Sequence, residues 1–219
     1  MVGYRGMDWV TISSLATAGG TLALAVATYA SVRSANRAAR VAELSVMAGL
    51  RPLLVESRLQ DPPQKVTFAD RHWVHVPGGC GTAEATDEAV YLTMSVRNVG
   101  SGVAVLHGWQ LHPGWRPGEQ PERPALDGFR RLTRDIYVPA GDLGWWQGAL
   151  RDPAAEEFAA ASGAIRDRSP LVVDLLYGDQ EGGQRVISRF SLVPRGGEGA
   201  DGWLASPARH WNVDRPDPR

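Results

Sequence analysis

The feature that most constrains this chain is a stretch without a charged residue, which runs from Trp9 to Val32 between Asp8 and Arg33. About 20 apolar residues in a helix are enough to cross the hydrocarbon core of a bilayer. Trp9 and Tyr29 lie near the two ends of the stretch, where amphipathic aromatic rings settle at membrane–water interfaces. The sequence therefore predicts a transmembrane helix over residues 9–32, which makes the lipid bilayer one partner of the protein.

Two other interpretations of the N-terminal segment, residues 1–32, are a soluble or interfacial helix and a cleaved signal peptide. A signal peptide has a shorter apolar region and carries its basic residues before that region. Here Arg33, Arg37 and Arg40 follow the apolar region and only Arg5 precedes it. Because Lys- and Arg-rich flanks stay in the cytoplasm, we expect a single-pass protein of the plasma (inner) membrane whose soluble domain is cytoplasmic.

The segment after the membrane helix, residues 33–51, is predicted to continue it as a helical stem. Ala, Arg, Glu and Leu favour a helix there, and proline at position 52 disfavours helical geometry in Arg51. Small apolar residues recur at intervals of three and four, at Val32, Ala35, Ala39, Ala42 and Val46. This stripe is either a contact between identical chains in a homo-oligomer or a face that lies on lipid headgroups or on the body of the protein.

The overall composition excludes one class of partner and supports none of the common kinds of active site. Lys and Arg number 23 against 24 Asp and Glu, for a net charge of −1, so there is no general electrostatic case for nucleic-acid binding. Cys80 is the only cysteine, so no intramolecular disulfide forms, which is typical of a reducing compartment. The sequence holds no phosphate-binding loop and no nucleophile elbow, and we expect neither a cofactor nor catalysis.

Residues 52–195 are predicted to form the folded body, a mainly β domain built as an antiparallel sandwich. Short apolar or alternating runs separated by turns rich in Gly, Asn and Pro are typical of such strands. The runs are Leu53–Leu59, His72–Val76, Val90–Val96, Gly102–Leu111, Ile136–Val138, Leu171–Tyr177 and Val186–Val193. Residues 196–219 are expected to form a loosely ordered tail rich in Pro and Gly.

One helix is predicted to interrupt the strands. Asp152 suits the N-cap position, Pro153 the first helical position, and two glutamates follow in the first turn. Phe158, Ala161 and Ile165 then share one face. We therefore expect a helix over Asp152–Ile165 that covers one end of the sandwich.

Two segments of the body resemble a known family. Leu92–Ala104 has the form strand–Asn–x–Gly–x–Gly–x–Ala–strand, and Val173–Leu192 has the form strand–Tyr–Gly–Asp–x–x–Gly–strand. Both are similar to segments of bacterial membrane-anchored proteins that carry an immunoglobulin-like β-sandwich domain. The resemblance covers roughly residues 50–195, and it implies a fold and a tethered layout but no catalytic residues.

The best candidates for a metal site are His72, His75 and Cys80, and they fit it poorly. A structural zinc site needs four N or S ligands, and two histidines three apart on one strand point to opposite faces. The cysteine lies in a glycine-rich stretch that is expected to be a flexible loop. We therefore predict no metal site.

Tryptophan is the more unusual feature, with eight in the chain. Trp109 and Trp115 flank a loop with Pro and Gly, and Trp145 and Trp146 are adjacent, so one ring of that pair is expected to face outward. Because Trp is enriched at binding hot spots, these four are the candidate contacts with a protein partner. The function predicted from sequence is a membrane-tethered interaction or scaffolding module, and the alternative is an exported, membrane-anchored domain that binds carbohydrate or other envelope components.

Overall fold

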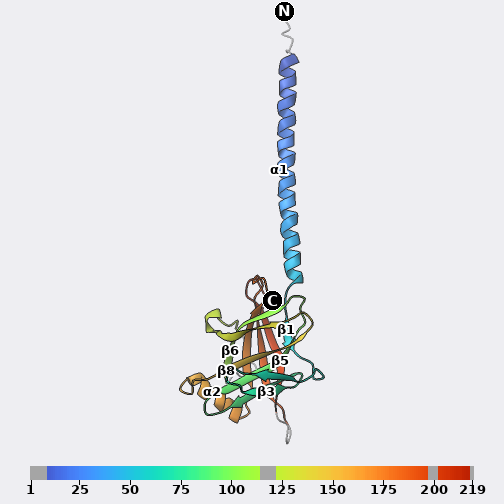
Figure 1. Cartoon of the computed structure of the whole chain (residues 1–219). Helices are drawn as coiled ribbons and strands as arrows, with labels where there is room; N and C mark the ends of the chain where they lie inside the picture. Colours follow the sequence, from blue (N-terminus) through green and yellow to red (C-terminus); the bar gives the residue numbers. More distant parts are fainter. Residues whose placement is uncertain (1–8, 114–121, 197–201, 218–219) are drawn as a thin grey trace, which may run out of the picture. The chain divides into compact units, whose positions relative to one another are not determined.

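The computed structural model describes residues 9–113, 122–196 and 202–217. The chain divides into two compact units, residues 1–48 and 49–219. The first unit consists of most of one long helix, and the second is a β-rich body with one short helix (Figure 1).

The long helix α1 (Trp9–Gly49) is continuous over 41 residues, which is about 62 Å at 1.5 Å per residue. The hydroxyl groups in its first half donate to carbonyls one turn earlier, as Ser14 does to Val10 O at 2.8 Å and Thr21 to Thr17 O at 2.9 Å. This bonding satisfies polar groups that lipid would leave unpaired. The prediction of one helix through the apolar stretch and the stem is confirmed, and this helix is long and apolar enough to cross a membrane.

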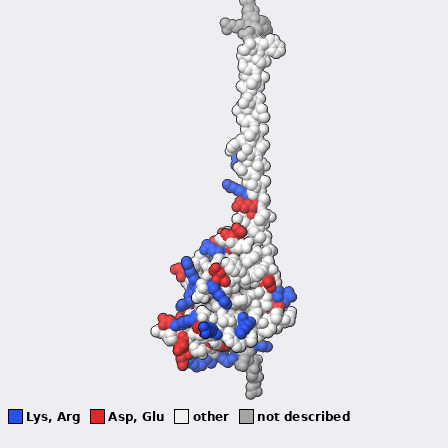
Figure 2. Space-filling model, viewed as in Figure 1, with Lys and Arg blue, Asp and Glu red and all other residues white. Residues whose placement is uncertain are grey.

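Charged side chains are confined to the C-terminal part of the described helix, and Figure 2 shows a long uncharged surface before them. None of the described side chains of α1 is buried. Trp9 is 84% exposed, Leu22 68% and Tyr29 68%. The side chains of the apolar stretch are thus exposed.

The body contains eleven described strands and two short helical segments. The strands are β1 (Leu54–Glu56), β2 (Gln64–Thr67), β3 (Trp73–Val76), β4 (Cys80–Ala85), β5 (Val90–Asn98), β6 (Ala104–Pro113), β7 (Arg130–Val138), β8 (Leu143–Leu150), β9 (Leu171–Gly178), β10 (Val186–Pro194) and β11 (Trp203–Asn212). The helical segments are the 3₁₀ turn η1 (Leu126–Gly128) and α2 (Glu156–Arg166). The body is therefore mainly β, as the sequence predicts.

Nine of these strands form one antiparallel sheet that curls into a half-barrel. One edge of β5 pairs with β8. The other edge pairs with β4 along the first half of β5 and with β1 along the last residues of β5. From β4 the order continues through β11, β10, β9 and β6 to β7. The immunoglobulin-like sandwich is not confirmed, because these strands belong to one curled sheet and only the hairpin of β2 and β3 stands apart.

Two clusters of buried side chains lie on opposite faces of β5 and β8. Alternate residues of these strands, among them Leu92, Met94 and Trp146, belong to the larger cluster that the curled sheet and α2 enclose. Their neighbours Tyr91 and Trp145 pack against the smaller cluster under the β2–β3 hairpin. This division follows from the two-residue period of a strand and makes β5 and β8 buried on both faces.

The C-terminal residues are not a loose tail. β11 lies inside the sheet, where it pairs with β10 along nine registered positions and with β4 at Trp203 and Leu204. Trp203 and Trp211 are 4% and 3% exposed. The predicted boundary at residue 195 is therefore wrong, since the body needs a strand that lies beyond it.

The helix in the body begins later than expected. Its N-cap is Ala155, and α2 runs from Glu156 to Arg166. Asp152 instead closes a turn before the helix, where its carboxylate accepts from Ala154 N–H at 3.1 Å and its carbonyl from Ala155 N–H at 3.1 Å. The side chain therefore caps a turn rather than the helix itself.

Candidate functional site

The two end strands of the curled sheet, β7 and β8, face each other without pairing. The tight turn that joins them is closed by a hydrogen bond from Asp142 N–H to Pro139 O at 3.1 Å. Close to the turn the strands nearly touch, since a Cβ on Gly144 would lie 2.5 Å from Val138 Cγ2. No strand pairing joins β7 to β8 in the described chain. We call the space between them the β7–β8 opening.

An irregularity in β7 accompanies the opening. β7 pairs with β6 near the turn, with Ile136 opposite Leu106, and again at its start, with Arg131 opposite Gly108. The four residues between, 132–135, face only one residue of β6. Such a bulge bends the strand that carries it, and it leaves the middle of β7 without a partner in the sheet.

The hydrogen bonds of β5 show which way its main-chain groups point. Val99 N–H donates to Leu53 O at 2.8 Å, and Ser57 N–H donates to Ser95 O at 3.2 Å. Odd-numbered residues at this end of β5 therefore direct their main-chain groups toward β1. Since these groups alternate in direction along an antiparallel strand, the even-numbered residues of β5 face β8.

The register then identifies the free main-chain groups of β8. Even-numbered residues of β5 lie opposite even-numbered residues of β8, as Met94 does opposite Trp146. The N–H and C=O groups of the odd-numbered residues Trp145, Gln147 and Ala149 consequently point away from β5. These groups form the free edge of β8, and they face the opening.

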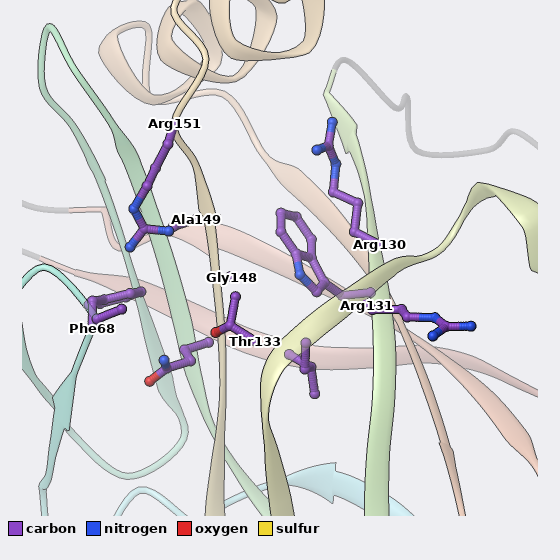
Figure 3. Close-up of a pocket in the computed structure, with 11 residues that line it drawn as sticks. Phe68, Arg130, Arg131, Thr133, Gly148, Ala149 and Arg151 are labelled. Carbon is purple, nitrogen blue, oxygen red and sulfur yellow. The ribbon is translucent and has the colours of Figure 1, made fainter.

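The opening holds a small cavity of about 140 Å³ between the walls of β7 and β8. In Figure 3, Phe68, Ala149 and Arg151 lie on one side of the cavity and Arg130 and Arg131 on the other. Pockets for drug-sized ligands are larger, about 300–1,000 Å³. The space is therefore suited to one or two side chains of a partner.

The floor of the cavity depends on a glycine. A Cβ on Gly148 would lie 2.8 Å from the rings of both Trp109 and Trp146, which is closer than carbon atoms pack. The two rings meet edge to face with centroids 5.5 Å apart. Any larger residue at position 148 would thus push against the two tryptophans, so glycine is what lets β8 pass over them.

Four arginines border the opening: Arg130, Arg131 and Arg151 line its cavity, and Arg134 reaches across it. Arg130 forms an ion pair with Glu157 of α2, and Arg151 pairs with Asp70 at 3.1 Å. Arg134 has neutral partners instead. Its Nη2 donates to Gln147 Oε1 of β8 at 2.8 Å and to a carbonyl of β2 at 3.4 Å. Arg134 therefore spans from β7 to β8 and brings a positive charge that no carboxylate of the described residues neutralises.

The partner of Arg151 remains a carboxylate at neutral pH. Burial raises the pKa of Asp70, but hydrogen bonds from Tyr91, from His72 N–H and from Arg151 outweigh it, so this pKa lies below its usual value. The Tyr91 hydroxyl donates to Asp70 Oδ2 at 2.8 Å, and this bond raises the pKa of Tyr91. Asp70, in the turn between β2 and β3, thus links this hairpin to Arg151 at the rim of the opening.

A separate groove of about 760 Å³ lies beside the opening, over β6 and β9. Arg131 and Asp135 line it from β7, and in Figure 3 the side chain of Arg131 extends away from Arg151. His107, another lining residue, has a pKa lowered mainly by burial. Charges of both signs alternate around this groove, so no single class of ligand is favoured there.

The four candidate tryptophans have different surroundings. Trp146 is 0% and Trp109 3% exposed, so their rings belong to the core, and of the two only Trp109 lines the cavity. Trp145 is partly exposed, and Arg134 lies over its ring at 5.9 Å. Trp115 lies outside the described residues. A contact role stays a prediction for Trp145, which belongs to the rim of the opening.

The remaining candidates do not assemble into a site. Arg33, Arg37 and Arg40 are exposed on α1. His72 pairs with Glu84 at 3.0 Å, and the residues that the structure describes contain no group of three potential metal ligands. Cys80 is the first residue of β4 and is buried, which raises the pKa of its thiol. The expectation that it lies in a flexible loop is therefore wrong.

Sequence reasoning missed the arginines of the opening. Arg130 and Arg134 lie four residues apart in a segment with few apolar residues, of which only Ile136–Val138 was predicted as a strand. A run of arginines flanking a Gly-Trp-Trp strand is a signal that could have drawn attention to the region.

Comparison with protein-family models, with curated proteins and with solved structures finds no match to this chain.

Proposed function

We propose that this chain is a single-pass membrane protein whose body acts as a protein-interaction module on the cytoplasmic side. The observation that carries the interaction is the β7–β8 opening, where two strand edges, four arginines and a partly exposed tryptophan come together. Unpaired strand edges are templates for another chain, and Arg and Trp are enriched among residues that dominate binding energy.

The tether is supported by the exposed apolar surface of α1. The stretch over residues 9–32 is long and apolar enough to span, and its side chains are exposed. Monomeric soluble proteins rarely expose a continuous apolar surface larger than a few hundred Å². A bilayer is the partner that buries a helix on all sides.

The orientation is supported by the charges that flank the helix. Three arginines follow the apolar stretch within about two turns, while Arg5 alone precedes it. Positively charged flanks are retained in the cytoplasm. The body, which follows these arginines, is thus proposed to lie inside the cell.

A cysteine-accessibility experiment tests tether and orientation together. Because Cys80 is buried, it is replaced by Ala, and a single exposed cysteine is introduced by Glu181→Cys in the turn between β9 and β10. A membrane-impermeant maleimide should label this cysteine only after cells are permeabilised. The reciprocal variant, Gly3→Cys, should be labelled in intact cells.

The opposite labelling pattern would place the body outside and make the envelope-binding alternative the better function. A full-length chain found in the soluble fraction would contradict the proposed membrane anchor.

Photo-crosslinking tests the interaction. A photoreactive amino acid at Thr133, an exposed residue of the opening, should capture a discrete protein in cells. The same amino acid at Asp87, an exposed residue of the β4–β5 turn, is the matched control. Equal crosslinking from both positions, or from neither, would contradict an interaction through the opening.

A further inference from the structure

We infer that the partner is an extended, acidic polypeptide segment that adds to the free edge of β8 inside the β7–β8 opening. The inference rests on the proposed function, since it names the kind of partner and the way in which the body holds it. Its three supports are the main-chain groups of β8, the size of the cavity and the charge of Arg134.

The main-chain groups favour a polypeptide over any other ligand. Trp145, Gln147 and Ala149 each direct one N–H and one C=O away from β5. These groups repeat at every second residue, which is the spacing that an added strand matches. Lipid headgroups and free anions offer acceptors but no donors at that spacing.

The cavity favours a strand whose side chains are of moderate size. Its volume of about 140 Å³ leaves room for a side chain over Trp109 but not for a bulky cofactor. Phe68 and Ala69 also line the cavity. An added strand would place alternate side chains into this space and the others toward solvent.

The charge of Arg134 favours an acidic segment. Its guanidinium donates only to neutral oxygens, of which the nearest is Gln147 Oε1 at 2.8 Å. A carboxylate forms stronger, charge-assisted bonds with a guanidinium, so an acidic side chain displaces the amide. At the wide end, Arg130 and Arg151 are 50% and 41% exposed in their ion pairs, and exposed pairs are weak enough to exchange partners.

Binding of synthetic peptides to the full-length protein in detergent tests the inference without altering the fold. The probe is a fluorescein-labelled eight-residue peptide of alternating Glu and Thr, and binding is followed by fluorescence anisotropy. The first control peptide carries N-methyl groups at alternate residues, which block hydrogen bonding along one edge. The second control replaces every Glu by Lys.

Two pairs of protein variants locate the site. Arg134→Gln removes the free charge, and Arg166→Gln, an exposed arginine at the end of α2 that does not line the cavity, is its matched control. Ala149→Pro deletes one N–H of the free edge, at a position where edge strands tolerate proline. Its control is Ala85→Pro at the end of β4, a strand that β5 separates from β8. Melting temperatures of all four variants show that they are folded.

The inference predicts that the acidic peptide binds, and that the N-methylated and lysine peptides bind at least tenfold more weakly, since each lost hydrogen bond costs about three- to tenfold. Arg134→Gln and Ala149→Pro should each weaken binding about threefold to tenfold, and their controls less than twofold. Equal binding of the N-methylated peptide would overturn strand addition. A second result would also overturn it: the unliganded protein forms a dimer, and Ala149→Pro converts that dimer to a monomer. The free edge of β8 would then pair with a second copy of the chain.

Failure of this inference is distinguishable from failure of the proposed function. If the peptides do not bind but crosslinking at Thr133 still captures a partner, the interaction module stands and strand addition is overturned. If crosslinking fails as well, the proposed function falls with it.

Discussion

Trp145 and Trp146 are neighbours in the sequence, but successive residues of β8 face different clusters. Trp146 fills the main core and is 0% exposed, while Trp145 packs partly under the β2–β3 hairpin. We expect Trp146→Ala to lower the free energy of unfolding by about 3–5 kcal/mol, the usual cost of removing a buried aromatic ring. Trp145→Ala should cost clearly less. Urea titration of the full chain measures both, and equal losses would contradict the different burial.

A buried ion pair gives a second prediction at the scale of single residues. Asp174 is 0% exposed, and both of its oxygens accept from Arg189 at 2.7 Å, while His112 Nε2 lies 2.6 Å from Oδ2. Asp174→Ala leaves the Arg189 charge buried without a partner, so it should cost about 3–5 kcal/mol in unfolding free energy.

The double change Asp174→Leu with Arg189→Met is the informative companion, because it removes both charges. It should be less destabilising than Asp174→Ala alone. If the double variant loses as much stability as the sum of both single changes, the penalty is one of packing and not of an unpaired charge.

At the scale of elements, β11 gives a prediction about truncation. A chain that ends at Arg195 lacks the strand between β10 and β4 and with it the buried Trp203 and Trp211. Two strand edges and much of the core then face solvent, and we expect the body to be unfolded or aggregated. Limited proteolysis and size-exclusion chromatography in detergent measure this. A chain that ends at Asp217 is the control, and a compact, protease-resistant body without β11 would contradict the sheet order.

The end of β11 is held by an ion pair that predicts a pH dependence. Hydrogen bonds from the Arg185 side chain, at 2.7 Å, and from its N–H, at 2.8 Å, lower the pKa of Asp214. Because the folded pKa lies below the unfolded value of about 4, the pair stabilises the fold above that value. This stability is lost as the pH falls through the folded pKa.

Asp214→Asn tests this dependence. At pH 7 the variant should be less stable than the native chain by about 0.2–1 kcal/mol, as expected for a partly exposed pair. The gap in urea midpoints should be smaller at a pH below about 4, under the unfolded pKa, than at pH 7. A gap that is the same at both pH values would rule out the carboxylate as its source.

The elements differ in how well the sequence predicts them, and the reasons are physical. The strands β5, β9 and β10 were predicted because their apolar runs are buried on both faces. β11 was missed because it contains Pro207, which interrupts a strand pattern. In the fold, the register between β10 and β11 shifts beside that proline, and a bulge is where a strand accommodates one.

β8 and the opening could not be predicted from local patterns. Gly144 and Gly148 break the apolar run of β8, yet each is required by a close neighbour in the fold, Val138 for the first and two tryptophan rings for the second. The opening itself arises from how a curled sheet ends, which depends on contacts between distant segments. The arginines are brought together beside the opening only by that geometry.

At the scale of the whole molecule, α1 is about twice as long as a bilayer core is thick. Its 41 residues span about 62 Å, against about 30 Å of hydrocarbon. We expect Leu24→Arg, in the middle of the apolar stretch, to release a large fraction of the protein from membranes, since an arginine at the centre costs about 2.5–3.5 kcal/mol. Val46→Arg, in the stem, should have no effect. Carbonate extraction measures the membrane fraction, and release by both changes or by neither would contradict a span over residues 9–32.

The position of β11 also sets an order of events during protein synthesis. α1 leaves the ribosome first, whereas β4 must wait for β11, which is encoded more than half of the chain later. At about 5–20 residues per second, this delay lasts roughly 6–25 s. Throughout it, the half-made sheet carries unsatisfied edges and unburied tryptophans. The body therefore folds only after its last strand has been translated, and a nascent chain stalled before β11 is a natural substrate for chaperones and proteases.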